Sequence, residues 1–223
     1  MHVKSTLTGL TSNDQHGNEP GESKESVMRK TILFAAVCML VAGQAMAQES
    51  PWLLRLRAVH MDMLNHDSTP YDLSVNNKTI PEFDVSYFFT ENIAAELVLT
   101  VPQKQKVYSN GTQIGSFKHL PPTLTAQYHF TNLKGFKPYV GAGFNYTKIY
   151  DVDILSGAFR LENDSFGYAL QVGVDIPLTP QVWLNFDVKK IGLKTKVYNS
   201  AGVSQGTLKL DPVLLGVGIG YRF

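Results

Sequence analysis

The residues of this sequence best suited to chemistry are ionisable side chains that recur at every second position. Arg55 and Arg57 stand two residues apart, as do Glu82 and Asp84. Residues at this spacing lie on one face of an extended chain, where guanidinium groups and carboxylates can form ion pairs. The set holds five basic and five acidic residues: Arg55, Arg57, Glu82, Asp84, Glu96, Lys137, Asp175, Asp187, Lys189 and Arg222.

Patterns for catalysis or for cofactor binding are weak. The histidines show neither H-x-x-x-H spacing nor cysteine partners for a metal, and no serine has a nearby histidine to act as its base. Gly216-x-Gly218-x-Gly220 is followed by no helix, so it does not fit a phosphate loop. We therefore expect no enzyme, no metal and no cofactor. The side chains considered are His60, His66, His119, His129, Ser156 and Ser165.

The ionisable residues lie in segments whose apolar residues also alternate with a period of two. This pattern predicts β-strands with one apolar and one polar face. Short links (90–92, 131–135 and 179–181) alternate with long polar ones (62–79, 103–120, 151–165 and 197–207), as in outer-membrane barrels. The eight segments are 52–58, 82–89, 93–101, 123–130, 136–146, 166–176, 184–189 and 213–223.

Residues 28–47 predict a signal peptide. A basic start at Met28-Arg29-Lys30 is followed by the apolar run from Ile32 to Val41 and by Ala45-Met46-Ala47, a cleavage signature. The run is shorter than the roughly 20 apolar residues of a membrane anchor. Residues 1–27 either precede a true start at Met28 or extend the signal. The expected mature chain, 48–223, lacks cysteine because Cys38 leaves with the signal.

Export and the placement of aromatic residues favour a membrane barrel over a soluble β-sandwich, which shows the same alternation. Aromatic rings at strand ends suit the headgroup level of a bilayer. A last strand ending in Tyr221-Arg222-Phe223 resembles the signal read by the barrel-assembly machinery, so we expect Tyr221 and Phe223 to serve as that signal. The aromatic residues are Trp52, Tyr87, Phe88, Phe89, Tyr128, Phe130 and Phe136.

We therefore predict an all-β fold: an eight-stranded antiparallel transmembrane β-barrel in the outer membrane of a Gram-negative bacterium, with long extracellular loops and short periplasmic turns. The interior of such a barrel is just wide enough for side chains. Because unpaired buried charges are costly, the inward ions should pair and obstruct the lumen, unlike a wide porin. The outer face should contact membrane lipid, and a net charge of +1 gives no reason to expect a nucleic-acid partner.

Several segments resemble the OmpW family in sequence and in order. The most characteristic is Lys118-His119-Leu120-Pro121-Pro122-Thr123-Leu124-Thr125, which leads into Gln127-Tyr128-His129-Phe130. The resemblance covers nearly the whole mature chain. The other matching segments are 137–143, 145–147, 173–175, 185–187 and 218–223.

The resemblance implies a hydrophobic pocket in the extracellular half, and passage of small hydrophobic molecules that leave sideways through a gap in the wall. Pro102 has no N–H for strand pairing, so it marks this gap or simply ends a strand. The family has Thr-Pro-Phe here, whereas this chain reads Val101-Pro102-Gln103. We expect the ligand path to consist of apolar side chains near the loops; the alternative for each is that it packs against other loop residues. These residues are Met61, Met63, Val98, Ile149, Ile154, Leu155 and Phe159.

Two other functions stay open at this stage. A structural barrel could use its long loops as an attachment site for bacteriocin, phage or host. An outer-membrane lipid enzyme would need a cluster of serine, histidine and acid at the lipid face. An apolar cavity in the upper barrel favours the channel, and a lumen packed shut favours the attachment role.

Overall fold

The structure is a computed structural model that describes residues 50–223. The predicted signal peptide and residues 1–27 lie outside the described residues. The elements are β1 (Trp52–Asp62), β2 (His66–Asp67), β3 (Leu73–Val75), β4 (Lys78–Phe88), β5 (Ile93–Thr100), β6 (Gln103–Ser109), β7 (Thr112–Leu120), β8 (Thr123–His129), β9 (Lys137–Ile154), the 3₁₀ turn η1 (Leu155–Gly157), β10 (Phe159–Leu161), β11 (Asp164–Pro177), β12 (Val182–Ile191), β13 (Lys194–Asn199), β14 (Ser204–Lys209) and β15 (Val213–Arg222).

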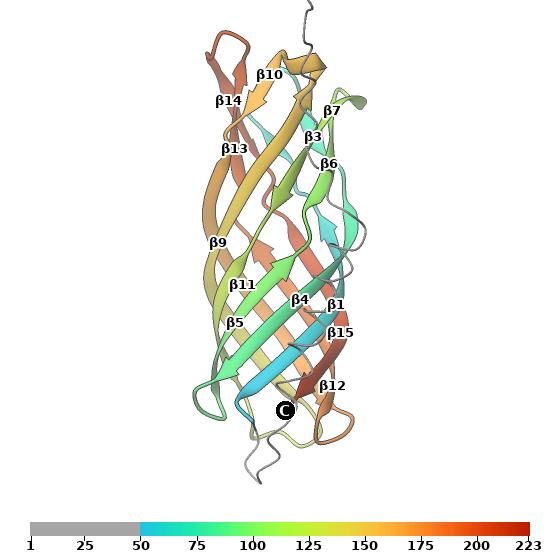
Figure 1. Cartoon of the computed structure of the whole chain (residues 1–223), viewed down its shortest axis with the longest axis vertical. Helices are drawn as coiled ribbons and strands as arrows, with labels where there is room; N and C mark the ends of the chain where they lie inside the picture. Colours follow the sequence, from blue (N-terminus) through green and yellow to red (C-terminus); the bar gives the residue numbers. More distant parts are fainter. Residues whose placement is uncertain (1–49) are drawn as a thin grey trace, which may run out of the picture. The chain divides into compact units, whose positions relative to one another are not determined.

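Eight of these strands close on themselves. The order β11-β12-β15-β1-β4-β5-β8-β9 returns from β9 to β11, and each neighbouring pair is antiparallel. The predicted eight-stranded antiparallel barrel is confirmed. In Figure 1 its strands run obliquely and short turns join them at the lower end. In the described part of the chain, no helix combines the length and the hydropathy needed to cross a bilayer.

The segments predicted as long loops are largely strands that extend the wall upward. β6 and β7 form a hairpin, β13 and β14 form another, and β9 continues to Ile154 to pair with β7. These strands were predicted as loops because the alternation of their apolar and polar residues is reversed. On β13, for example, Lys194 and Lys196 face outward while Thr195 and Val197 are buried. Outside the membrane a strand meets water on its outer face, so its apolar residues turn inward.

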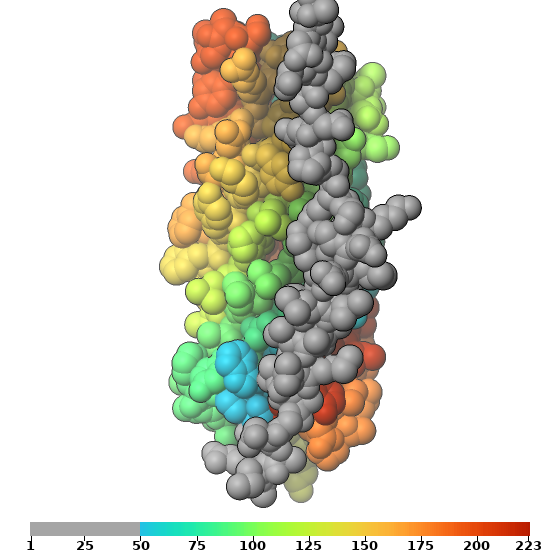
Figure 2. Space-filling model, in the orientation of Figure 1, coloured from blue at the N-terminus to red at the C-terminus, as the bar shows by residue number. Residues whose placement is uncertain are grey.

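Lower on the barrel the outer face is apolar and the inner face is ionic. Leu56, Phe144 and Phe166 are 63%, 62% and 67% exposed, whereas Arg55 and Arg57 are each 1% exposed. Apolar side chains on the outside and charges on the inside suit a barrel whose wall meets hydrocarbon. Figure 2 shows the side where green β5 and β8 give way to yellow β9, with side chains protruding along the wall.

One of the aromatic residues assigned to the outer girdle faces inward. Phe88 is buried at 6% exposure, whereas its neighbour Phe89 is 66% exposed. Successive residues of a strand point to opposite faces, so the two cannot both reach lipid. Phe88 instead forms a small cluster at the lower end of the lumen with Leu53, Ala94 and Trp183.

Glycine on β15 lets the last strand approach the arginines of β1. A Cβ on Gly218 would lie 2.1 Å from the carbonyl oxygen of Leu56 and 2.6 Å from Cγ of Arg57. A Cβ on Gly216 would come no closer than 3.4 Å, to Cδ of Arg57. The two glycines belong to the same strand but differ in the room around them.

We predict that Gly218→Ala lowers the free energy of unfolding by about 1–3 kcal/mol, because backbone and Arg57 must shift to admit the methyl group. Gly216→Ala is the matched control and should change it by less than about 0.5 kcal/mol. Urea unfolding in detergent micelles, followed by the mobility of the folded barrel on unheated gels, measures both. Equal losses in the two variants would contradict the assigned packing.

Candidate functional site

Arg55 on β1 binds carboxylates from two sides of the barrel. Its Nη2 lies 2.7 Å from Oδ2 of Asp175 and its Nη1 lies 3.1 Å from Oδ1 of Asp84. Nη1 also donates to the hydroxyl of Ser86 at 2.9 Å. Because β1 and β11 are not neighbours in the barrel, the Arg55–Asp175 contact crosses the lumen.

Arg57, two residues after Arg55 on β1, is the centre of the charged cluster. Its Nη2 binds Asp84 and lies 2.6 Å from Oε1 of Glu96, and its Nη1 lies 3.3 Å from Oδ1 of Asp187. Lys189 on β12 adds a third cation, whose Nζ lies 3.1 Å from Oε1 of Glu82. We call these eight residues the ionic plug: Arg55, Arg57, Glu82, Asp84, Glu96, Asp175, Asp187 and Lys189.

Neutral donors add hydrogen bonds to three of the five carboxylates. Nε2 of Gln171 donates to Glu96 at 2.9 Å and to Asp187 at 2.8 Å. The hydroxyl of Tyr139 donates to Asp187 at 2.8 Å, and Nδ2 of Asn185 donates to Asp175 at 2.8 Å. All eight residues of the plug are at most 4% exposed. The plug therefore fills the lumen at mid-height.

Two of the ten residues predicted for the charge network lie elsewhere. Lys137 begins β9 and places its Nζ 4.4 Å from the ring centre of Trp183. Arg222 ends β15 and lies over the ring of Phe88 at 4.5 Å, and its Nε donates to the carbonyl of Ser50. Alternation predicted the inward face of both residues. Lys137 is paired in register with Asp175 of the plug, but its ammonium group extends to Trp183, and Arg222 is paired with Leu53, below Arg55 on β1.

Above the plug most of the buried side chains are apolar. The side chains come from strands all around the barrel and from its upper extension, and they form one buried cluster. This apolar column comprises Val59, Met61, Met63, Leu73, Val75, Ile80, Val107, Phe117, Ile149, Ile154, Leu161, Ala169, Ile191, Leu193, Val197, Leu208, Leu210 and Leu214.

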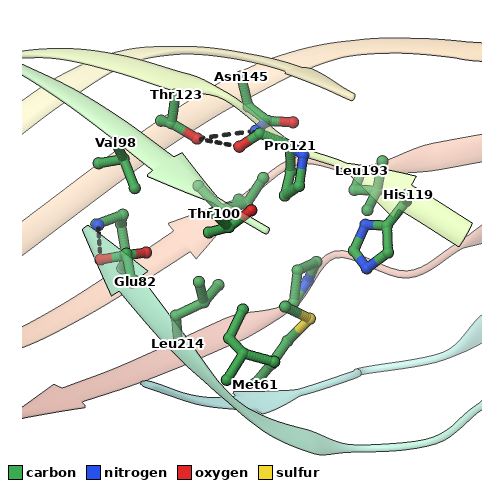
Figure 3. A pocket seen from close by; sticks show the side chains of 14 residues that line it. Met61, Glu82, Val98, Thr100, His119, Pro121, Thr123, Asn145, Leu193 and Leu214 are labelled. Atoms are coloured by element: carbon green, nitrogen blue, oxygen red, sulfur yellow. Dashed lines mark hydrogen bonds and ion pairs between the residues drawn. The ribbon is translucent and has the colours of Figure 1, made fainter. Parts of the chain in front are cut away.

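Two cavities lie along the apolar column. The lower one, of about 20 Å³, rests on Glu82 and Lys189 of the plug and is lined above them by Met61, Leu193 and Leu214 among others; Figure 3 shows several of these side chains around one space. The upper one, of about 50 Å³, includes Tyr71, Ile114 and Phe159 in its lining. The lower space is about the size of a water molecule, so a larger guest needs side chains to move.

The wall beside the lower cavity is interrupted. Pairing of β5 with β8 ends at Val98–Thr123, and pairing of β6 with β7 resumes at Gln103–His119. Between these two ladders, residues 99–102 on one side and residues 120–122 on the other are not paired with each other. Pro102, Pro121 and Pro122 have no N–H to close it. We call this interruption the wall break.

The side chains flanking the wall break reach the lower cavity. Val98, Thr100, Pro121 and Thr123 all line it. Asn145 holds the β8 side in place, because its Nδ2 donates to Oγ1 of Thr123 at 2.9 Å and to the carbonyl of Pro122 at 3.2 Å. Two of the interactions that Figure 3 marks with dashed lines involve Thr123, and one of these joins it to Asn145.

The structure brings most of the predicted path residues together and separates one of them. Met61, Met63, Val98, Ile149 and Ile154 are buried, and Phe159 packs partly buried against the apolar column. Leu155 is 52% exposed because it belongs to the 3₁₀ turn η1 at the rim, where it only borders the upper cavity. The prediction missed Leu193, Leu208, Leu210 and Leu214, although they continue the reversed alternation.

Comparison with known proteins agrees with this geometry. The OmpW family model matches residues 56–223. The chain belongs to the OmpW family. The uncharacterised outer-membrane protein y4mB of Sinorhizobium fredii is 44% identical over 186 residues, which cover 78% of this chain and 80% of the relative. This OmpW-family chain is therefore an outer-membrane protein.

Two further matches extend the comparison of this OmpW-family member. The dibenzothiophene metabolism operon protein PahQ of Pseudomonas aeruginosa is 28% identical and covers 88% of this chain, with its own length fully covered. The solid-state NMR structure of outer membrane protein AlkL in lipid bilayers has a TM-score of 0.65 at 27% identity. It covers 81% of this chain and 93% of AlkL.

The residues first considered for catalysis or metal binding lie apart in this OmpW-family barrel. His129 stacks on Tyr139 near the lower end, with ring centres 4.8 Å apart, while Ser156 belongs to η1 at the upper rim. Residues 50–223 contain no group of three or more His, Cys, Asp or Glu side chains placed to hold a metal ion.

The last strand of the OmpW-family barrel ends in aromatic rings. Tyr221 is 48% exposed, and its ring packs edge-on against that of Phe223 at 5.1 Å. β15 closes the barrel against β1, and the carbonyl of Phe223 accepts a hydrogen bond from Ser50. The assembly signal assigned to Tyr221 and Phe223 stays a prediction.

His119 lies above the membrane-facing belt, on β7. Burial, and to a smaller extent the charge of Lys78, lower its pKa to about 4. Glu82 and Lys189 line the same lower cavity. The imidazole is therefore neutral at neutral pH and presents one donor and one acceptor.

We predict that Arg57→Met lowers the free energy of unfolding of this OmpW-family barrel by about 3–5 kcal/mol, because it leaves buried carboxylates without their central cation. Lys148→Met is the control. Its ion pair with Asp164, at 3.1 Å, is about half exposed on both sides, so its loss should cost at most about 1 kcal/mol. Urea midpoints in micelles measure both, and an unchanged midpoint for Arg57→Met would contradict the plug.

We also predict a pH effect from His119. Between pH 6.5 and 4 the unfolded chain binds a proton that the folded barrel does not, so the free energy of unfolding falls as the pH is lowered through this range. His119→Gln should reduce that fall, whereas the same change at the exposed His60 should not. Urea unfolding at pH 7, 5.5 and 4.5 compares the three proteins, and identical pH profiles for wild type and His119→Gln would contradict the assignment.

Proposed function

We propose that the barrel is a passive channel for small hydrophobic molecules, which enter at the extracellular mouth and leave sideways into the bilayer through the wall break. The observation that carries the proposal is the position of the lower cavity. It lies at the foot of the apolar column, above Glu82 and Lys189 of the plug, and beside the break between β5 and β8.

The apolar column supports entry from above. Transfer of an apolar molecule from water to a site among apolar side chains is favourable. Movement from one such site to the next changes its free energy little. Met61 and Met63 are unbranched and flexible, which suits a lining that must rearrange around a guest. In this proposal the lower cavity, of about 20 Å³, is that of the barrel without a guest. Passage requires its lining side chains to move apart.

The plug supports exit to the side. A hydrophobic molecule gains nothing by displacing Arg55 and Arg57 from their carboxylates, since breaking a buried ion pair is costly. The wall break needs no ladder hydrogen bonds to be broken. The easier way out therefore passes between Val98 and Thr123 on one side and Gln103 and His119 on the other.

A relative adds chemical context. PahQ is named as a protein of an operon for the metabolism of dibenzothiophene, an apolar aromatic molecule. We propose the same broad class, small and largely apolar, as the cargo of this chain.

The alternative is a surface-attachment barrel for bacteriocin, phage or host. It is favoured by the tight packing of the lumen, whose lower cavity has room for about one water molecule. Uptake experiments separate the two functions, because an attachment barrel has no reason to admit an apolar probe.

We predict that Val98→Asp reduces uptake of a hydrophobic fluorescent probe about fivefold or more, because it places a polar group in the apolar passage. Val203→Asp, at a position 58% exposed near the extracellular rim, is the control. Whole Gram-negative cells that express each protein at equal folded levels provide the measurement. Unchanged uptake in folded Val98→Asp would remove this residue from the path.

We predict further that a cross-link over the wall break blocks passage. Thr100→Cys with Pro121→Cys joins two side chains that line the lower cavity, in a mature chain that otherwise lacks cysteine. A short thiol cross-linker should abolish probe uptake in this variant. The control pair Ala95→Cys with Ala126→Cys lies within the continuous ladder of β5 and β8, and cross-linking it should leave uptake unchanged. Equal uptake with the break locked would contradict lateral exit.

A further inference from the structure

Three polar atoms above the plug are buried without a hydrogen-bond partner. They are Oγ1 of Thr100, Oε1 of Gln105 and Nδ1 of His119. Gln105 is 0% exposed and His119 is 1% exposed. They stand among apolar side chains, where an unpaired polar group is costly. Such groups call for an explanation at each site where they occur.

The three residues lie at one place in the wall. His119 and Thr100 line the lower cavity beside the wall break, and Figure 3 shows both among its lining side chains. Gln105 on β6 faces His119 across the hairpin, with its Nε2 3.4 Å from Nε2 of His119. The same Nε2 lies 3.7 Å from Sδ of Met61, another residue of the cavity.

Neighbouring polar side chains of the lumen are better satisfied. Gln171 beside the plug donates to two carboxylates and also accepts from Gln127. Asn145, which lines the same cavity, donates to three oxygen atoms. Two other buried atoms, Nε of Arg57 and Nδ1 of His129, also lack a hydrogen bond, but they lie 3.2 Å from Glu82 and 3.9 Å from Asp175. The three atoms above the plug lie together beside the wall break.

We propose that His119, with Thr100 and Gln105, binds the single uncharged hydrogen-bonding group, a hydroxyl or a carbonyl, of an otherwise apolar ligand as it reaches the wall break. This inference rests on the proposed channel function and names its substrate class: alcohols, phenols and ketones with an apolar body, in preference to plain hydrocarbons. The apolar column takes the body of the ligand, and the three polar atoms take its one polar group.

The charges around the site fit an uncharged ligand. Burial lowers the pKa of His119 to about 4, so at neutral pH the ring carries no charge to attract a carboxylate. Glu82 and Lys189 face the cavity from below, and they are already paired with each other at 3.1 Å. A hydroxyl can donate to Oε1 of Gln105 and can accept from the ring or from Thr100.

The first experiment measures uptake selectivity in whole Gram-negative cells that express the full chain. Uptake rates of octan-1-ol and octane are compared as a ratio, which cancels differences in expression. His119→Leu should lower the ratio about three- to tenfold, the range expected for the loss of one hydrogen bond. His119→Gln should keep it, since the amide still donates and accepts. His60→Leu, on the outer face of β1, is the control and should also keep it.

The second experiment measures binding without transport. The purified barrel, carrying ¹⁵N-labelled histidine, is titrated with octan-1-ol and with octane in micelles. We expect the ring nitrogen signal of His119 to shift with the alcohol and not with the alkane. Comparable responses to both ligands, or no response to either because an ordered water alone satisfies the three atoms, would overturn the inference.

The two experiments fail differently. If both probes are taken up but His119→Leu leaves their ratio unchanged, the polar site is wrong and the channel stands. If octan-1-ol shifts the His119 signal but neither probe is taken up, the site stands and the channel is wrong. If neither binding nor uptake occurs, both proposals are overturned.

Discussion

The pairing of Arg55 and Arg57 with carboxylates inside a closed barrel is the constraint on which the rest of the structure depends. Eight strands leave an interior only wide enough for side chains, and the guanidinium groups occupy its middle at 1% exposure. Glycines on β15 make room for them, and a Cβ on Gly218 would collide with Arg57. Charges that cannot reach water must be satisfied on the spot, so donors such as Gln171 and Tyr139 gather around the carboxylates. The plug divides the lumen into an aromatic lower end and an apolar upper half.

Much of this arrangement could be predicted from the sequence, because alternation reports which face of a strand each residue takes. The eight barrel strands, the inward ions and the outward apolar belt all followed from it. Height along the barrel did not follow. Lys137 and Arg222 were placed on the inward face, but their charged groups lie over the rings of Trp183 and Phe88, because long side chains reach positions that strand pairing alone does not show. Phe88 was assigned to the lipid-facing girdle by its position at a strand end. Because adjacent residues of a strand point to opposite faces, the outward position of Phe89 places Phe88 in the interior.

The upper barrel was missed for a different reason. A strand that meets lipid outside and ions inside shows the opposite pattern from a strand that meets water outside and apolar side chains inside. The chain changes from one pattern to the other within single strands: on β1, Arg55 and Arg57 are followed on the same face by Val59 and Met61. The segments 103–120 and 197–207 have no apolar outer face, so they were predicted as loops. Their buried residues, such as Val107 and Leu208, form part of the apolar column, so the same reversal that concealed the strands creates the candidate passage.

The most direct test of the account is solid-state NMR of the barrel in bilayers, measuring magnetisation transfer to each side chain from lipid acyl chains and from mobile water. The account predicts strong acyl-chain transfer to Leu56, Phe144 and Phe166 on the outer face. It predicts transfer from neither source to the side chains of Arg57 and Asp84 in the plug. Strong transfer from mobile water to Arg57 and Asp84 would mean an open aqueous lumen, and would contradict the division of the barrel on which the proposed passage rests.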